Sequence, residues 1–235
     1  MRSVPISLHL LIVMSAPALA DPRAILQQGI QAFERGDFAE AAAQFEQAAA
    51  QARGSDLDPS VPWFNQGVAL YRKGLLDAAV EAFLRARNTT DLDRQARALY
   101  NAGTTRLRQF DAAVERRDGA KLETYLAEAI HYLERSLVIR PDQEHVRRQL
   151  EVALERRERL LASVQQLDRV LAEVSRLLEA FEFEKAHRIL MDSREEVGLA
   201  LLLPNEKTKA FEQMMERTGQ IVAILNAGQT GNVAP

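Results

Sequence analysis

The side chains that usually carry catalysis or bind metal ions are sparse in this sequence. It contains no cysteine, which excludes thiolate metal sites and disulfide bonds. His131, His145 and His187 stand far apart, and none forms an i, i+4 pair that could bind a metal from one helix face. No glycine-rich phosphate loop or nucleophile elbow is present. We therefore expect that the protein is not an enzyme and has no metal site and no cofactor.

Side chains suited to contacts with another protein are easier to find. Gln27, Asn65 and Asn101 each stand two positions before a glycine. A side-chain amide both donates and accepts hydrogen bonds, so it can pair with the backbone of an extended peptide, and aromatic neighbours would add apolar anchors. The candidate partner-binding residues are Gln27, Phe64, Asn65, Val68, Tyr71, Arg72, Tyr100, Asn101, Thr104 and Arg108. The alternative is that these side chains only contact neighbouring helices.

The elements that must position these side chains are helices in a repeated pattern. Between residues 62 and 86, Trp63, Gly67 and Leu70 recur at i, i+4 and i+7, which is one face of a helix. A turn is expected at Gly74, and a second helix carries Ala79, Phe83 and Ala86 at the same spacing. Such a short antiparallel pair cannot bury its apolar faces alone, so stacked neighbours are required.

This spacing resembles the tetratricopeptide repeat (TPR). The matching residues are Trp63, Gly67, Ala79, Phe83 and Ala86; upstream Gly29, Gly36, Phe38, Ala41, Phe45 and Ala48; and downstream Leu99, Tyr100, Asn101 and Gly103, continued by Ala129, Leu133, Ser136 and Pro141. The resemblance implies an all-α, right-handed helical solenoid of about three helix pairs that binds other proteins in its concave groove. It further implies that Asn65 and Asn101 hold peptide backbone there.

The pattern divides the chain into repeats and a helical extension. The TPR-like part covers 21–141, with repeats at 22–55, 60–93 and 96–143. Gly103 and Ala129 are 26 residues apart, whereas Gly67 and Ala79 are 12 apart, so the third repeat holds an insertion near 106–121. We expect a lengthened first helix, a turn at 118–119 and a lengthened second helix, forming either a functional lip or an inert extension. A helical cap at 142–227 and a disordered tail at 228–235 complete the division.

A heptad seam stands out in the extension. Its apolar positions are Leu160, Val164, Leu167, Leu171, Val174, Leu178 and Phe181. Two interpretations remain open. In the first, the seam belongs to a long helix and packs on the helices that follow it. In the second, residues 160–181 form a coiled coil between copies, and the protein is a structural homo-oligomer, for example a homodimer.

The N-terminus and the overall charge predict the cellular location. Residues 1–20 have a positive charge, an apolar centre and a small-x-small end at 18–20, which is typical of a signal peptide cleaved after Ala20. An exported chain without cysteine suits the bacterial periplasm, with any membrane attachment supplied by a partner. The 30 basic and 33 acidic residues leave a net charge of -3, which argues against nucleic acid as a partner.

A narrower resemblance suggests the kind of partner. The segments 98–103 (Ala-Leu-Tyr-Asn-Ala-Gly) and 140–155 are similar to exported TPR proteins encoded beside von Willebrand factor A-domain proteins in bacterial aerotolerance-type clusters. This similarity implies a periplasmic or membrane-attached protein, such as a von Willebrand factor A-domain protein, as the partner of an adaptor.

Overall fold

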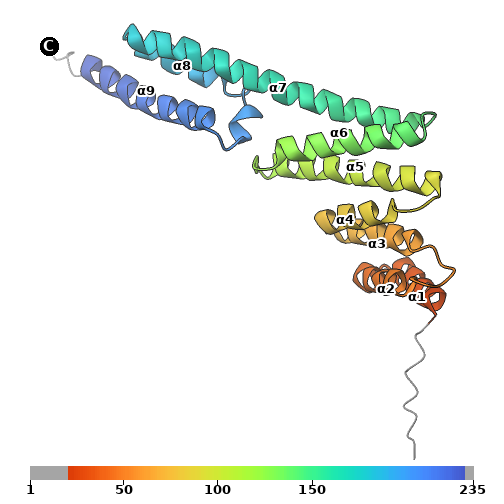
Figure 1. Cartoon of the computed structure of the whole chain (residues 1–235). Coiled ribbons are helices and arrows are strands. Elements are labelled where there is room, and N and C mark those ends of the chain that lie inside the picture. Colours follow the sequence, from red (N-terminus) through yellow and green to blue (C-terminus); the bar gives the residue numbers. More distant parts are fainter. Residues whose placement is uncertain (1–20, 231–235) are drawn as a thin grey trace, which may run out of the picture.

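The computed structural model describes residues 21–230, which form nine successive α-helices and no strand (Figure 1). The helices are α1 Pro22–Glu34, α2 Phe38–Gln51, α3 Ser60–Lys73, α4 Leu76–Ala86, α5 Leu92–Glu115, α6 Leu122–Ile139, α7 Glu144–Glu179, α8 Phe183–Ser193 and α9 Glu206–Thr230. A 3-10 helix, η1, covers Ala200–Leu202. The predicted signal peptide, residues 1–20, lies outside the described residues. Within 21–230, no helix combines the length and the apolar character that crossing a membrane requires.

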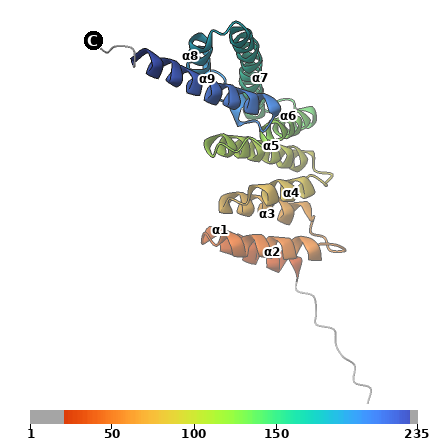
Figure 2. The same ribbon diagram turned by 90° about the vertical axis from the view of Figure 1, so that its left-hand side faces the viewer.

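The first six helices form three antiparallel pairs that stack on one another, as two perpendicular views show (Figures 1 and 2). Close packing within each pair depends on a glycine of its first helix. A Cβ atom at Gly29 would lie 2.7 Å from the ring of Phe45, and one at Gly67 would lie 2.6 Å from the ring of Phe83. At Gly103 a Cβ would lie 2.8 Å from the side chain of Leu133. The repeated glycines therefore let each first helix lie directly against a large apolar side chain of the second.

One backbone motif ends α1, α3, α5 and α7. After α1, the N–H of Gly36 donates to the carbonyl of Phe33 and the N–H of Asp37 donates to the carbonyl of Ala32, which is a Schellman motif. The left-handed residue at its centre is Gly36 after α1 and Gly74 after α3, both with φ +85°. The same position holds non-glycine residues after α5 and α7. These are Arg117, with φ 57°, and Phe181, with φ 59°.

The third pair is longer than the first two, as its wider spacing predicts. Helix α5 has 24 residues and α6 has 18, against 11 to 14 in the earlier helices. The turn between them reaches the C-terminal segment, because a Cβ at Gly119 would lie only 1.7 Å from the carbonyl oxygen of Leu202. Leu203 is buried in the same core as Leu122. The inserted residues thus pack against η1 and the segment that follows it.

Helix α7 joins the helix pairs to the C-terminal helices. It has 36 residues, and its buried positions Val146, Ala153, Leu160, Leu167 and Val174 recur every seven residues. Residues up to Leu160 pack in one core with α6, and later ones pack in another core with α8, η1 and α9. The seam is therefore covered within the chain, as the first interpretation expects, and it begins 14 residues earlier than the sequence suggested.

Three boundaries differ from the sequence-based expectation. Phe181 was expected on the seam, but α7 ends at Glu179 and the left-handed turn leaves the Phe181 side chain 78% exposed. Asp142 follows Pro141 in the sequence as a potential N-cap, yet the residue before the first turn of α7 is Gln143, without a side-chain cap. The backbone of α9 continues to Thr230, whereas the sequence predicts a tail from residue 228, and residues 231–235 lie outside the described residues.

Candidate functional site

A pocket of about 510 Å³ lies where α3, α5 and α7 meet, and it brings together most of the predicted binding residues. The predicted residues that line it are Val68, Tyr71, Tyr100, Asn101, Thr104 and Arg108. The residues that the sequence reasoning did not select are Phe83, Thr105, Leu107, Asp111, Gln149, Val152 and Arg156. Pockets of a few hundred Å³ are the size that proteins use to bind side chains or small ligands.

The residues that α5 contributes to the pocket lie on one face of the helix. Tyr100, Thr104, Arg108 and Asp111 follow one another at steps of four, four and three, so they share one face. The other side of the helix is fixed in place, because Gly103 is buried against α6. This arrangement directs the polar face of α5 away from its own pair.

Helix α7 supplies a wall that the sequence reasoning missed. Gln149, Val152 and Arg156 follow at steps of three and four and form a second face of α7, next to its buried seam. His145 lies near the same wall, with its ring edge-to-face to Tyr100 at 5.0 Å between centroids. The helical spacing of these residues was visible in the sequence. What the sequence did not show is that the start of α7 lies alongside α5.

Two arginines give the pocket its charge. The Arg108 guanidinium lies 4.6 Å from the centre of the Tyr71 ring and forms no ion pair in the described part of the chain. Arg156 donates to the Asp111 carboxylate at 2.9 Å. Burial raises the pKa of Asp111, and Arg156 only partly offsets this effect. Arg108 is therefore the cation that remains available for a bound partner.

The amides expected to hold peptide backbone are unused within the chain. Among residues 21–230, the side chains of Gln27, Asn65 and Asn101 make no hydrogen bond. Only the backbone carbonyl of Asn101 is engaged, by the hydroxyls of Thr104 and Thr105. Asn101 lines the pocket, whereas Gln27 and Asn65 lie outside it on α1 and α3. The amides thus keep both donor and acceptor free for an external group.

Two other predicted residues also lie outside the pocket. The Phe64 ring packs edge-to-face on Phe83 at 5.7 Å, with the Arg97 guanidinium 5.1 Å from its centre. Arg72 stacks over the Phe38 ring at 5.1 Å. In the structure Phe64 contributes to the contact between helix pairs, and Arg72 lies near the turn after α1.

An ion-pair network joins the second and third pairs on the side of α5 opposite the pocket. Arg106 lies 2.6 Å from Asp77 on α4 and 2.5 Å from Glu128 on α6, and its side chain is only 15% exposed. Hydrogen bonds from Gln109 and Arg106 lower the pKa of Asp77. This network fixes α5 between its neighbours and so fixes the position of the pocket wall.

The described residues hold no group of three or more histidine and carboxylate side chains that could bind a metal ion. No protein-family model and no curated protein matches the chain.

Proposed function

We propose that this protein is a TPR-like scaffold, a right-handed helical solenoid that binds a segment of another protein along α1, α3 and α5. The observation that carries the proposal is the pocket at α3, α5 and α7, which gathers six of the predicted binding residues around an unbonded Asn101 amide. Stacked helix pairs with repeated glycine contacts support the TPR-like architecture.

The chemistry of the pocket suits an extended peptide. The Asn101 amide can pair with the peptide backbone whatever its sequence, and the Asn65 amide can do the same further along the groove. Val68, Tyr71 and Tyr100 offer apolar surface for one inserted side chain. The free guanidinium of Arg108 favours a neutral or acidic segment over a basic one.

The proposed setting is the bacterial periplasm, with export by the N-terminal segment. There the protein acts as an adaptor for a periplasmic or membrane-attached partner, such as a von Willebrand factor A-domain protein. This choice rests on the resemblance of segments 98–103 and 140–155 to exported TPR proteins. The protein itself is proposed to catalyse nothing.

A crosslinking pull-down from periplasm and inner membrane tests the proposal. The mature chain 21–235 is compared with the double variant Asn65→Ala/Asn101→Ala, after circular dichroism confirms that both are folded. The matched control is Gln47→Ala/Gln165→Ala, which removes two exposed helical amides outside the pocket. We expect one or a few proteins to be captured by the wild type and the control and lost from the Asn variant. Equal capture by all three would overturn the proposed site.

A further inference from the structure

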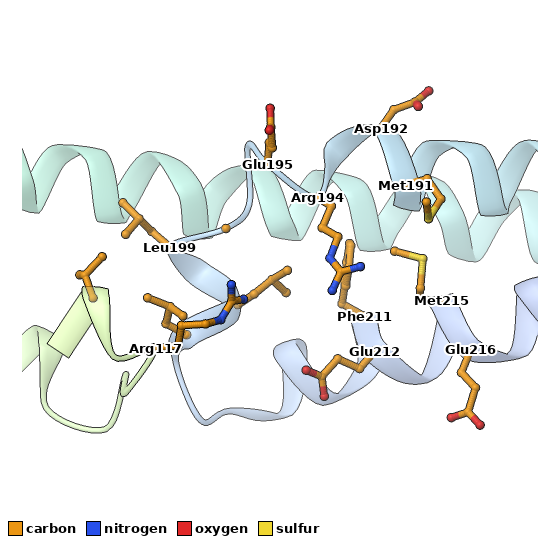
Figure 3. A pocket seen from close by; sticks show the side chains of 14 residues that line it. Arg117, Met191, Asp192, Arg194, Glu195, Leu199, Phe211, Glu212, Met215 and Glu216 are labelled. Atoms are coloured by element: carbon orange, nitrogen blue, oxygen red, sulfur yellow. The ribbon is translucent and has the colours of Figure 1, made fainter.

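A second and larger pocket lies at the C-terminal end of α5. It has a volume of about 1030 Å³ and is formed by the end of α5, the end of α8, the segment through η1 and the first half of α9 (Figure 3). None of its lining residues also lines the pocket at α3, α5 and α7. Its function is therefore a separate question from that of the groove.

Arg117 contributes the first notable feature of this pocket. It occupies the left-handed position of the Schellman motif after α5, where the first two pairs have Gly36 and Gly74. The N–H of Arg117 donates to the Val114 carbonyl at 3.0 Å, so the motif forms as it does elsewhere. A side chain at this position is unfavourable because its Cβ crowds the backbone. Phe181 after α7 has the same strain, and Arg117 differs from it because Arg117 lines a pocket.

Arg194 provides the second feature, since it stands opposite Arg117. In Figure 3 both guanidinium groups extend into the space between the walls, whereas Asp192, Glu195 and Glu216 point outward. Glu212 lies on the lower wall, yet neither arginine is within ion-pair distance of any carboxylate in the described part of the chain. Both arginines are exposed, so their guanidinium groups are available to an anionic group that lies between the walls, although the lining as a whole also carries four carboxylates.

The remaining lining is apolar and adaptable. Its apolar residues are Val114, Met191, Leu199, Leu201, Leu202, Phe211 and Met215. Met191 is 51% exposed, and methionine side chains adjust readily to the shape of a bound apolar group. A ligand that fits both features has one anionic head and an apolar tail. The carboxylates of the lining repel any anion, and they repel a ligand with several negative charges, such as a nucleotide, more strongly than a ligand with one.

We propose that this pocket binds a small carboxylate with an apolar tail, of the chemical class of medium-chain fatty acids. Arg117 and Arg194 bind the carboxylate, and Met191, Phe211 and Met215 contact the tail. Such a ligand gives the exposed guanidinium of Arg117 a role at a position where the first two pairs have glycine.

The experiment is a titration of the chain labelled with [13C-methyl]methionine, followed by NMR. Decanoate is added below its micelle concentration, with acetate and decyltrimethylammonium as matched probes that carry the head alone or the same tail with a positive head. We expect decanoate to shift the methyl signals of Met191 and Met215 saturably, and the probes to shift them little. The neighbouring Met214 does not line the pocket and serves as the internal reference. No saturable shift, or equal binding of decyltrimethylammonium, would overturn the proposal.

The decisive variant is Arg117→Gly, because it removes the guanidinium and relieves the left-handed strain together. We expect the melting temperature to rise while decanoate binding weakens at least about tenfold, the loss expected for one charge-assisted contact. Phe181→Gly is the matched control, since it relieves the same strain at the end of α7 and should leave binding unchanged. Arg194→Gln should weaken binding to a similar degree. Unchanged affinity in both arginine variants would contradict the assignment.

Discussion

Single side chains decide how closely the helices of each pair approach. Gly29 and Gly67 occupy the same place in successive pairs, and each faces a phenylalanine ring at a distance that leaves no room for a methyl group. The phenylalanine is held by the opposite helix, so the glycine and the ring act as one unit. The regular spacing of glycine and phenylalanine in the sequence reflects this contact.

The substitution Gly67→Ala tests this packing. The added Cβ would lie 2.6 Å from the Phe83 ring, so the ring or the helix must shift, and we expect a loss of about 1–3 kcal/mol in the free energy of unfolding. Urea denaturation measures it. In the background of Phe83→Leu the same substitution should cost less, because the smaller side chain leaves space. Equal costs in both backgrounds would show that the glycine is needed for another reason.

Asp58 makes the stability of the chain depend on pH. Its carboxylate accepts hydrogen bonds from the Thr89 hydroxyl at 2.8 Å and from Arg94 at 2.6 Å, and Ser60 donates its N–H at 2.8 Å. Burial alone would raise the pKa of Asp58, but the hydrogen bonds from Ser60 and Thr89 and the charge of Arg94 lower it below its ordinary value of 3.8. The unfolded chain then binds more protons than the folded one, so this stabilisation is present at neutral pH and is lost as the pH falls through the folded pKa.

We therefore expect Asp58→Asn to lower the free energy of unfolding at pH 7 and to have a smaller effect below about pH 4. Urea denaturation between pH 3 and pH 7 measures the difference from the wild type. Asp56→Asn is the control, because the pair of Asp56 with Arg23 is exposed and should contribute little. A difference for Asp58→Asn that does not change with pH would rule out the role of its charge.

Among the helices, α7 shows what the sequence could and could not reveal. Its seam was recognised from Leu160 onward, but the earlier positions Val146 and Ala153 were missed because a valine and an alanine give a weak apolar signal. The sequence did not identify the residues that cover the seam, because periodicity indicates a buried face but not the element that packs against it. For the same reason the wall that α7 contributes to the groove could not be predicted. The pairing of α5 with α6 could be predicted from the sequence, because the spacing that starts at the glycine identifies both helices.

The turn between α5 and α6 couples the third pair to the C-terminal segment. Gly119 lies so close to Leu202 that Gly119→Ala must displace the backbone of η1. We expect a loss of about 1–3 kcal/mol in the free energy of unfolding and faster hydrogen exchange in residues 196–205. Ala120→Ser changes an exposed neighbour and serves as the control. An unchanged rate of hydrogen exchange in residues 196–205 would mean that this segment does not pack on the turn.

The molecule as a whole is built from a series of local cores. Separate clusters of buried residues lie in the first pair, between the second and third pairs, around α6 and α7, and around α8 and α9. Each helix packs mainly on its neighbours in sequence, as in repeat proteins, whose stability is a sum of nearest-neighbour terms. The proposed TPR-like architecture accounts for this organisation.

The covered seam leads to a prediction about the oligomeric state. Leu167 and Val174 are buried against α8 and α9, so a coiled coil through 160–181 would require those helices to move away. We expect the mature chain to be a monomer in light scattering at micromolar concentration. A dimer that Leu171→Glu converts to a folded monomer would instead support the homo-oligomer hypothesis.

The most direct measurement of the groove hypothesis is site-specific photocrosslinking in the periplasm. A photoreactive phenylalanine analogue replaces Thr104, which lines the pocket, and in a second chain it replaces Gln47, which is exposed on α2 outside it. The hypothesis predicts a crosslink to a defined partner protein from position 104 and none from position 47. The same crosslinks from both positions, or none from position 104 while a partner is still co-purified, would contradict a partner bound in the groove.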